Sequence, residues 1–233
     1  MLANAGFENG FYKFQNIGEL EVATGWEPWY LENVKSPGGA VYHRPEYKPE
    51  KVGVGKGRVH SGTYGQKQFT TYSSHDGGLR QNIDTEKGKW YRFSAWVYVW
   101  SSEQDNADIS KCPGRYRAMV GANPWADWAK ADTTIWGEEI IDKYDQWMQV
   151  QVIFQAWHTR AALYTRGNPW YGPKHNDSYW DNIELVQLVE PGTEPGPSVP
   201  VDSIYATLQI ASIHNGNASA SIEAAMELLK PPV

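Results

Sequence analysis

The 233-residue sequence contains one cysteine, Cys112, and few phenylalanines. A single cysteine forms neither an intrachain disulfide nor a cysteine-based metal site. The 6 phenylalanines compare with 12 tryptophans and 14 tyrosines. Trp and Tyr combine a flat ring with a polar atom, and an excess of them is typical of surfaces that meet a ligand. We therefore expect aromatic side chains to carry the function.

The sequence lacks the features that are typical of several function classes. No apolar run approaches the length of a membrane span. Residues 1–3 show no signal peptide, which predicts a cytoplasmic protein, an assembly component or a processed chain. The net charge of −6 argues against a nucleic-acid or anionic-membrane partner. The histidines lack zinc-site spacing, and no nucleophile elbow, P-loop or dinucleotide fingerprint is present. The sequence therefore predicts no catalytic residue.

The remaining composition is that of a globular chain, with 41% hydrophobic and 21% charged residues. Short strands broken by Gly and Pro, with no helix expected before residue 190, predict an all-β fold. We expect residues 1–190 to form a single β-sandwich domain.

Two segments, residues 90–100 and 147–157, alternate apolar residues with aromatic and polar ones. Successive side chains of a strand point to opposite faces, so each segment is expected to bury one face and present the other. Gln66 and Gln68 are expected on the same kind of presented face. Residues 161–166 are expected to complete a hairpin with the second segment.

The presented faces and nearby loops supply the candidate ligand contacts. Sugars stack on flat rings, and glutamine offers both a donor and an acceptor to hydroxyl groups. The alternative is that these rings pack in a second core or under loops, and that Arg44 and Glu46 form an ordinary ion pair. The candidates are Trp96, Tyr98, Trp100, Gln149, Gln151 and Trp157 on the faces, and Trp29, Tyr30, Arg44 and Glu46 beside them.

Residues 175–185 are predicted to form the last strand. Strict alternation places Asp181 on the same face as Ile183 and Leu185. A carboxylate buried there must be neutralised, paired or bound to a cation. The acidic segment around Glu8 offers a partner, so we expect the first and last strands to lie side by side and share a structural cation. A hydrogen-bonded or solvated pair is the alternative.

Four motifs together resemble the carbohydrate-binding jelly rolls of the xylan- and glucan-binding modules, in the galactose-binding-like sandwich group. The resemblance covers roughly residues 3–190. It implies a structural calcium, with Glu8 and Asp181 as carboxylate ligands, and glycan binding without catalysis. Longer loops at residues 31–56 and 101–114 depart from the usual module, so the ligand class is not carried over. The motifs are Asn4-x-Gly6-Phe7-Glu8-x-Gly10, Gly25-Trp26, Trp90 to Val97 and Tyr179 to Leu185.

The C-terminal part changes in composition. Residues 191–200 form a Pro/Gly linker, and residues 201–233 are predicted to form a hairpin of two short amphipathic helices. Helices this short are marginal alone in water, so their apolar stripes need a partner. We expect them to anchor the chain by forming a homo-oligomer, and contact with a neighbouring domain or with the sandwich itself is the alternative.

Non-catalytic polysaccharide binding is therefore the function that the sequence favours. One alternative is a structural or assembly protein of a cell surface or virion, with the sandwich as a decoration domain. A further alternative is a jelly-roll glycanase or lyase. The expected location is extracellular, at a cell surface or in a virion.

Overall fold

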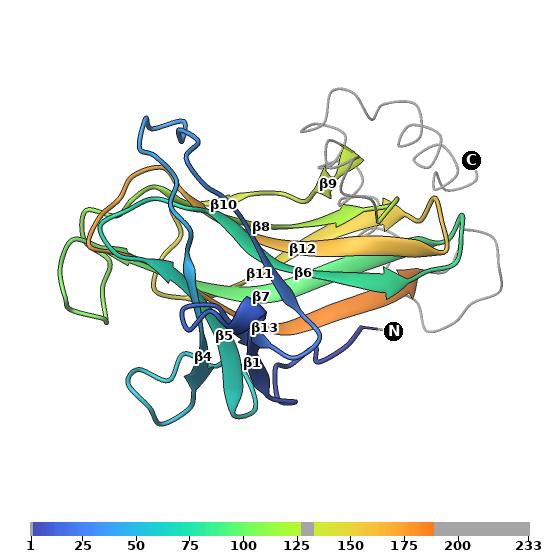
Figure 1. The fold of residues 1–233 in the computed structure, drawn as a ribbon, viewed down its shortest axis with the longest axis horizontal. Helices are drawn as coiled ribbons and strands as arrows, with labels where there is room; N and C mark the ends of the chain where they lie inside the picture. The colour runs from blue at the N-terminus through green and yellow to red at the C-terminus, as the bar shows by residue number, and fades with distance from the viewer. Residues whose placement is uncertain (1, 127–132, 189–233) are drawn as a thin grey trace, which may run out of the picture. The chain divides into compact units, whose positions relative to one another are not determined.

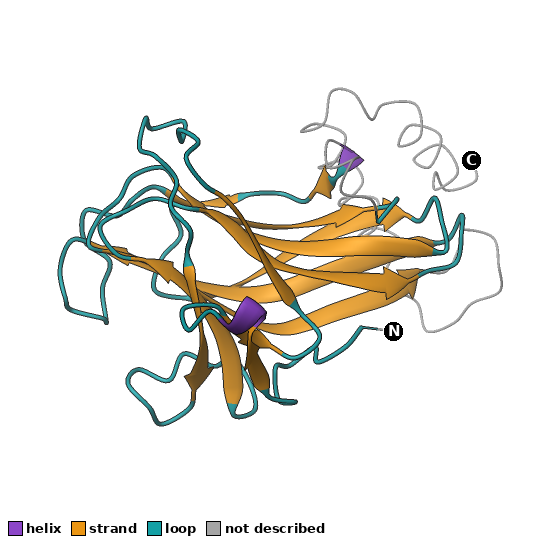
Figure 2. Ribbon diagram, in the orientation of Figure 1, coloured by secondary structure: helices purple, strands orange, loops and turns teal. Residues whose placement is uncertain are grey.

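The structure, a computed structural model, describes residues 2–126 and 133–188. Regular structure in these residues is almost entirely β (Figure 2), and one compact unit covers Met1–Val186. A 3-10 turn spans Phe14–Asn16. The strands are β1 (Phe11–Lys13), β2 (Glu21–Ala23), β3 (Glu27–Leu31), β4 (Glu46–Lys51), β5 (Tyr64–Thr70), β6 (Asp76–Asp84), β7 (Trp90–Ser102), β8 (Tyr116–Asn123), β9 (Ile135–Trp136), β10 (Ile140–Ile141), β11 (Trp147–Gln155), β12 (Arg160–Pro169) and β13 (His175–Leu188).

Two antiparallel sheets form a sandwich (Figure 1). The six-stranded sheet has the order β10-β8-β12-β6-β3, with β9 also paired to β8, and the five-stranded sheet has the order β11-β7-β13-β5-β4. The predicted all-β sandwich is confirmed. The predicted hairpin of β11 with β12 is wrong: β11 pairs with β7, whereas β12 lies between β6 and β8 in the other sheet.

The core lies between the two sheets, and β7 and β11 face it as the alternation predicts. The odd-numbered residues of β7, from Tyr91 to Val99, are at most 5% exposed. In β11, Val150, Val152 and Phe154 are buried in the same cluster. Burial of apolar area contributes roughly 25 cal/mol per Å², so this alternation fixes which side of each strand faces outward.

The glutamines of β5 lie on the opposite side from the one predicted. Gln66 and Gln68 are 0% and 1% exposed and face the sandwich interior. The Gln66 amide donates to the carbonyls of Glu21 and Lys48 at 3.1 and 3.0 Å, and its oxygen accepts from the Ala23 N–H at 2.8 Å. Buried amides that satisfy backbone groups behave as core residues, which is why polarity alone misplaced them.

The last strand, β13, changes its alternation at Asn182. This residue has a φ of +45°, in the left-handed region that a regular strand does not use. Trp180 faces the core before it, and Ile183 faces the core after it. Asp181 therefore does not share a face with Ile183, as strict alternation predicted, and its carboxylate instead reaches residues 60–61.

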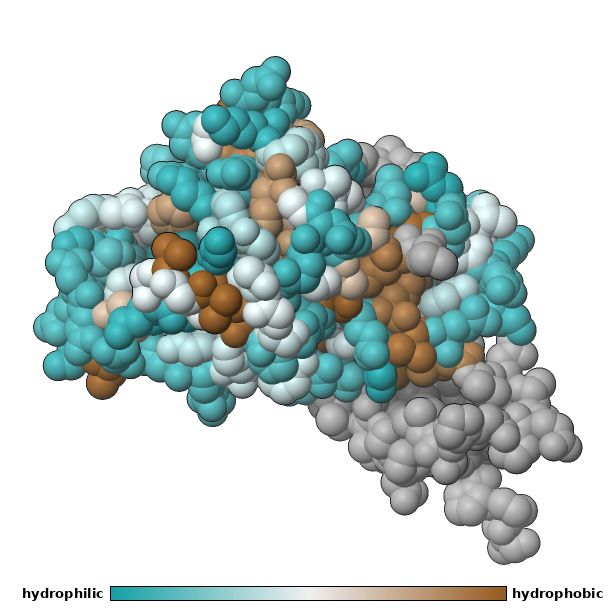
Figure 3. Space-filling view, turned by 90° about the horizontal axis from the view of Figure 1, so that it is seen from below, coloured by the Kyte–Doolittle hydropathy of each residue, from teal (hydrophilic) through white to brown (hydrophobic). Residues whose placement is uncertain are grey.

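Hydrophilic residues cover most of the described surface that Figure 3 shows, and hydrophobic ones gather in limited patches. Within the described ranges, no helix is long and apolar enough to cross a membrane. The predicted linker at residues 191–200 and the helical pair at residues 201–233 lie outside the described residues, as does the oligomerisation that they were expected to support.

Candidate binding surfaces

The outer face of the five-stranded sheet carries most of the predicted ligand contacts. In the ladder between β7 and β11, Gln149 lies opposite Trp96, and Trp147 lies opposite Tyr98. Residues directly opposite one another share a face of the sheet. The predicted residues that the structure brings together on this face are Trp96, Tyr98, Trp100, Gln149 and Gln151.

Histidine rings stack on two of these tryptophans. The His60 imidazole lies on Trp96 with the ring centroids 4.2 Å apart and the planes 18° apart. The His175 imidazole lies on Trp100 at 4.4 Å, and Trp100 is only 6% exposed. A sugar needs an open ring face for stacking, so these contacts leave little of Trp96 and Trp100 for a ligand.

Arg58 covers the neighbouring rings of the same face. Its guanidinium carbon lies 4.7 Å from the ring centroid of Tyr98, 4.9 Å from that of Tyr179 and 5.2 Å from that of Trp100. The guanidinium also donates to the Tyr179 hydroxyl at 2.9 Å and to the carbonyl of Ala107. Desolvated cation–π contacts are worth about 2 kcal/mol, so Arg58 holds its loop against this face. Burial raises the pKa of the Tyr179 hydroxyl above its ordinary value.

Trp157 lies away from this group. The β7–β11 ladder runs from Trp147 opposite Tyr98 to Gln155 opposite Trp90, a length of about 26 Å at ~3.3 Å per residue. Trp157 follows Gln155, so it lies at the far end of the ladder from Trp100. There it is 41% exposed and packs edge-on against Trp125 at 5.6 Å.

The four other predicted contacts also occupy different places. Tyr30 packs against the core, and Arg44 is half-buried in the segment before β4. Glu46, at the edge of the five-stranded sheet, forms an ion pair with Lys48 at 3.1 Å. Trp29 alone lies on the outer face of the six-stranded sheet.

That outer face holds three rings in contact, Trp29, Tyr164 and Trp136, which we call the ring platform. Their centroids are 6.0 to 6.1 Å apart. Trp29 lies opposite Gly78 of β6, and its indole nitrogen donates to the Thr165 carbonyl of β12, the next strand, at 2.9 Å. A Cβ atom at Gly78 would collide with the Thr165 carbonyl, the group that accepts from the indole, so glycine here allows β12 to approach β6 closely, and the hydrogen bond fixes the orientation of the indole.

Trp136 packs against a second glycine. It lies opposite Gly121 in the ladder between β8 and β9, and Gly121 lies opposite Tyr164 in the ladder between β8 and β12. A Cβ atom at Gly121 would approach the Trp136 ring to 2.5 Å. The two indoles thus lie on either side of Tyr164, which is itself buried at 5% exposure.

Arginine–carboxylate pairs surround the ring platform. In one of them, Nε and Nη2 of Arg166 donate to the two oxygens of the buried Asp76 at 2.7 and 2.6 Å. The Arg166 guanidinium carbon also lies 5.0 Å from the Trp136 ring centroid. Two-pronged pairs of this kind are strong and hold their geometry. The pairs on this face are Arg80–Glu27, Arg166–Asp76 and Arg117–Glu139.

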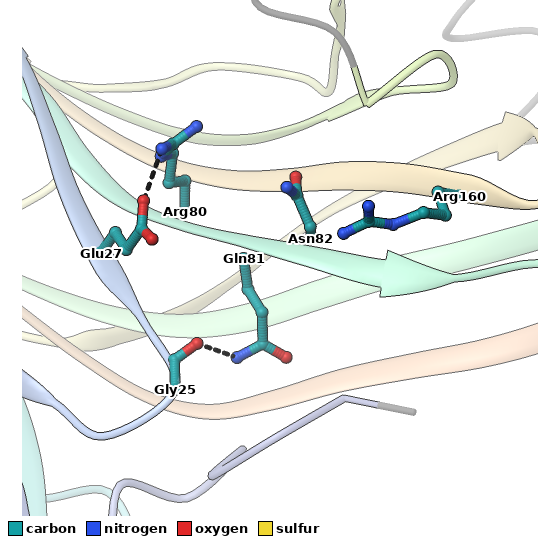
Figure 4. A pocket seen from close by; sticks show the side chains of 6 residues that line it. All are labelled: Gly25, Glu27, Arg80, Gln81, Asn82 and Arg160. Carbon is teal, nitrogen blue, oxygen red and sulfur yellow. Dashed lines mark hydrogen bonds and ion pairs between the residues drawn. The ribbon is translucent and has the colours of Figure 1, made fainter.

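A pocket adjoins the ring platform (Figure 4). Arg80, which lines it, lies opposite Tyr164 in the strand register and pairs with Glu27, two residues before Trp29. Figure 4 shows the Arg160 guanidinium pointing toward the Asn82 side chain. The pocket is therefore polar, and Arg80 is the lining residue that the strand register places beside Tyr164. Its lining residues are Gly25, Glu27, Arg80, Gln81, Asn82 and Arg160.

The two predicted calcium ligands, Glu8 and Asp181, hold neighbouring parts of one loop. The Glu8 Oε1 atom accepts from the N–H groups of Thr63 and Tyr64 at 2.8 and 2.9 Å. Between the two contacts lies Gly62, whose φ is +74° and where a Cβ atom would approach Glu8 Oε1 to 2.3 Å. Glycine at this position therefore allows the close approach.

The Asp181 carboxylate is held by N–H donors on both oxygens. Oδ2 accepts from His60 and Ser61 at 2.8 and 3.0 Å, and Oδ1 accepts from Asn182 at 2.7 Å. Burial raises the pKa of this carboxyl, and the N–H donors oppose that rise. No cluster of three or more His, Cys, Asp or Glu residues in the described ranges could hold a metal ion. A calcium ion needs oxygen ligands, so the N–H donors that Glu8 and Asp181 accept from do not fit a calcium shared by these two carboxylates.

The first and last segments meet, but not as the neighbouring strands that the sequence predicts, because β1 pairs with β2 and β13 lies between β7 and β5. The Ala5 carbonyl accepts from the Ile183 N–H at 2.9 Å. The Asn4 side chain donates to the Thr24 carbonyl at 3.0 Å and accepts from the Asn9 N–H at 2.9 Å, so the acidic and amide-rich start is an ordered turn. The contact between the termini is thus made by the backbone and by hydrogen bonds.

No family model matches the chain, and no curated protein matches its sequence. Its structure is similar to that of carbohydrate-binding modules. TmCBM61, solved in complex with β-1,4-galactotriose, superposes with a TM-score of 0.51 at 14% identity over 80% of this chain and 97% of its own. The CBM22-2 xylan-binding domain of Paenibacillus barcinonensis Xyn10C gives 0.45 at 13% identity, over 78% and 97%.

A cyclase from Fischerella sp. TAU, solved with 4-(1H-indol-3-yl)butan-2-one, is similar to the same extent as TmCBM61. Its TM-score is 0.51 at 14% identity, and the alignment covers 85% of this chain and 98% of the cyclase. The shared fold therefore occurs in binding modules and in an enzyme. The fold alone does not decide between binding and catalysis, and the side chains of the outer faces have to do so.

Two residues of the ring platform, Tyr164 and Trp136, were not predicted from the sequence. The alternation of residues 160–169 does place Tyr164 and Arg166 on the side away from the buried Leu163. Glycine within a strand often marks a close approach of another group, and Gly121 is such a position. These two signals together could have indicated the six-stranded sheet.

Proposed function

We propose that the protein binds a polysaccharide, without chemical change, on the outer face of the six-stranded sheet. The observation that carries this proposal is the ring platform, in which Trp29 is held across β6 by its hydrogen bond to Thr165 and meets Tyr164 and Trp136. Flat rings fixed on a sheet, with hydrogen-bonding groups beside them, suit the apolar faces and hydroxyl groups of sugars. The galactotriose bound by TmCBM61, which has a similar fold, supports the same ligand class.

Binding without catalysis is favoured by the state of the carboxylates on this face. Glycoside hydrolysis uses two carboxyl groups that exchange protons or attack the sugar. Here Glu27, Asp76 and Glu139 each bond an arginine. Such pairs shape and polarise a surface, but they leave none of these three carboxylates placed to work on a glycosidic bond. The proposal includes a location where polysaccharides occur, outside the cell, at a cell surface or in a virion.

The outer face of the five-stranded sheet is the competing surface. The Trp100 Nε1 and Ser94 Oγ atoms are buried there without a hydrogen-bond partner among residues 2–126 and 133–188. A ligand could satisfy them only after the side chains of His60, His175 and Arg58 moved. On the platform, Tyr164 is itself 5% exposed and Arg166 lies over the Trp136 ring, so the assignment of binding to this face rests on Trp29, whose indole nitrogen is bonded and on which no histidine stacks among the described residues.

Three tryptophan variants separate the surfaces. Trp29→Ala removes the platform, Trp96→Ala tests the five-stranded sheet and Trp157→Ala tests the exposed ring at the end of the sandwich. We expect Trp29→Ala to weaken polysaccharide binding by about tenfold or more, as for a central aromatic contact, and the other two to bind like the wild type. Affinity electrophoresis in gels that contain galactan, xylan or β-glucan measures this.

Thermal unfolding of each variant shows whether the domain remains folded. Loss of binding in Trp96→Ala, with Trp29→Ala unaffected, would move the site to the five-stranded sheet. Absence of binding by the wild type to every neutral and acidic polysaccharide on a glycan array would reject the proposed function.

A further inference from the structure

The pocket beside the ring platform offers hydrogen-bond donors and a cation. Arg80 is paired with Glu27, and the Gly25 carbonyl already accepts from Gln81 at 2.9 Å. The Arg160 guanidinium and the Asn82 side chain have no partner among the described residues, and both are exposed. Arg160 has five N–H donors and Asn82 adds two more. The groups left for a ligand are therefore mainly donors.

The neighbouring acidic residues do not change this balance inside the pocket. Glu27 lines the pocket, but Arg80 takes up its carboxylate. Asp84 lies opposite Arg160 in the strand register and does not line the pocket. A cation at this position stands out in a chain whose net charge is −6. The local arrangement thus favours an acceptor with negative charge over a hydroxyl group, which both donates and accepts.

We infer that this pocket binds the carboxylate of an acidic sugar, so that the polysaccharide bound by the platform contains uronic acid residues; this inference rests on the proposed glycan binding. Arginine matches a carboxylate with two parallel N–H donors, and the Asn82 amide can supply a further donor. Arg80, opposite Tyr164, links the pocket to the rings. Arg160 precedes Tyr164 by four residues on β12, about 13 Å at ~3.3 Å per residue, so a polysaccharide stacked on the platform would reach Arg160 with a later sugar of the chain and not with the next one.

The test uses a glycan array with acidic polysaccharides in pairs, native and carboxyl-reduced, beside neutral polysaccharides. The full chain is compared with Arg160→Gln, Arg160→Lys and Lys87→Gln. Lys87 is an exposed residue after β6 that does not line the pocket, so its variant removes the same charge elsewhere. Arg160 is an exposed strand residue, so its variants are expected to fold.

The wild type is expected to bind the native acidic polymers about fivefold or more tightly than their reduced forms, as for one charge-assisted contact. Arg160→Gln should remove this difference and keep the binding of reduced and neutral polymers. Arg160→Lys should retain part of the preference for native polymers, because lysine keeps the positive charge but cannot make two parallel hydrogen bonds to a carboxylate. Lys87→Gln should behave like the wild type, and added salt should weaken only the acidic component.

Three results would overturn the inference. They are wild-type binding confined to neutral polymers, equal binding of native and reduced forms, and a preference that persists in Arg160→Gln. In each case, binding of neutral polysaccharides that is lost in Trp29→Ala would still support the proposed function. Binding of dextran sulfate that is insensitive to Trp29→Ala would identify simple ion exchange and would also overturn the inference.

Discussion

The buried His75 is expected to make the stability of the sandwich depend on pH. Its ring is 0% exposed and joins the two sheets, with Nδ1 2.8 Å from the Thr70 hydroxyl and Nε2 3.0 Å from the Tyr116 hydroxyl. Burial lowers the pKa of His75 to about 3 from an ordinary value of 6.5. The unfolded chain therefore takes up a proton near pH 6.5, whereas the folded protein does so only near pH 3.

The direction and size of the effect follow from this difference. Above pH 6.5 both states hold a neutral ring, so the stability contribution of His75 is fully present. As the pH falls from 6.5 toward 3, the unfolded state binds more protons and the free energy of unfolding decreases. Each pH unit is worth about 1.4 kcal/mol, so lowering the pH from 6.5 to 4.5 should remove about 2–3 kcal/mol through His75.

The assay is urea unfolding followed by tryptophan fluorescence at pH 7.5, 5.5 and 4.5, for the wild type and His75→Gln. The variant is expected to be less stable at pH 7.5, and the difference between the two proteins should shrink by about 2–3 kcal/mol at pH 4.5. Asp181 and the other carboxyls titrate in both proteins, so their effects largely cancel in the difference. A difference that does not change with pH would refute a neutral, buried His75.

Two further predictions address the platform and the termini. Gly121→Ala should displace the Trp136 ring and weaken polysaccharide binding severalfold, at a stability cost of about 1 kcal/mol. The control is Gly18→Ala, in which no atom lies within 4 Å of the added carbon and which should bind like the wild type. Equal binding by the two variants in affinity electrophoresis would remove Trp136 from the platform. Excess EDTA should leave the melting temperature of the protein unchanged, because backbone N–H groups already face Glu8 and Asp181. A fall in the melting temperature that added calcium reverses would contradict this prediction and support the calcium site.

The sequence predicted the strands that are buried on one face, because their alternating apolar residues reflect the large free energy of apolar burial. The apolar residues of β7 and β11 lie in the core as expected. The same reasoning failed for Gln66 and Gln68, since a buried amide is compatible with the interior when it bonds backbone groups from other strands. Those partners, Glu21 and Lys48, are distant in sequence, and no local pattern indicates them.

A single backbone angle explains the error at the last strand. The positive φ of Asn182 reverses the alternation, so Asp181 and Ile183 face opposite ways. Asn adopts this conformation more readily than most residues, but its presence does not require it. The consequence for the metal prediction is direct, because Asp181 turns to the N–H groups of residues 60–61 and away from the apolar side of β13.

Prediction of the candidate site from the sequence fails for the same reason, because contacts between distant residues decide which side chains are exposed. The composition predicts that rings carry the function, and β7 does present Trp96 and Tyr98 outward. A sequence does not show which rings the chain covers itself, and here His60 and Arg58 come from a loop about forty residues away.

The proposed assignment of sugar binding to the six-stranded sheet rests on how its rings are held and not on the number of rings. On the five-stranded sheet, stacking by His60 on Trp96 at 4.2 Å occupies the surface that a ligand would use. On the six-stranded sheet, Trp29 is fixed by a hydrogen bond through its edge, to Thr165, which uses the polar atom of the indole and not its face. Edge fixation lowers the entropy that ligand binding would otherwise cost. A surface built in this way is prepared for stacking, which is why the smaller group of rings is the better candidate.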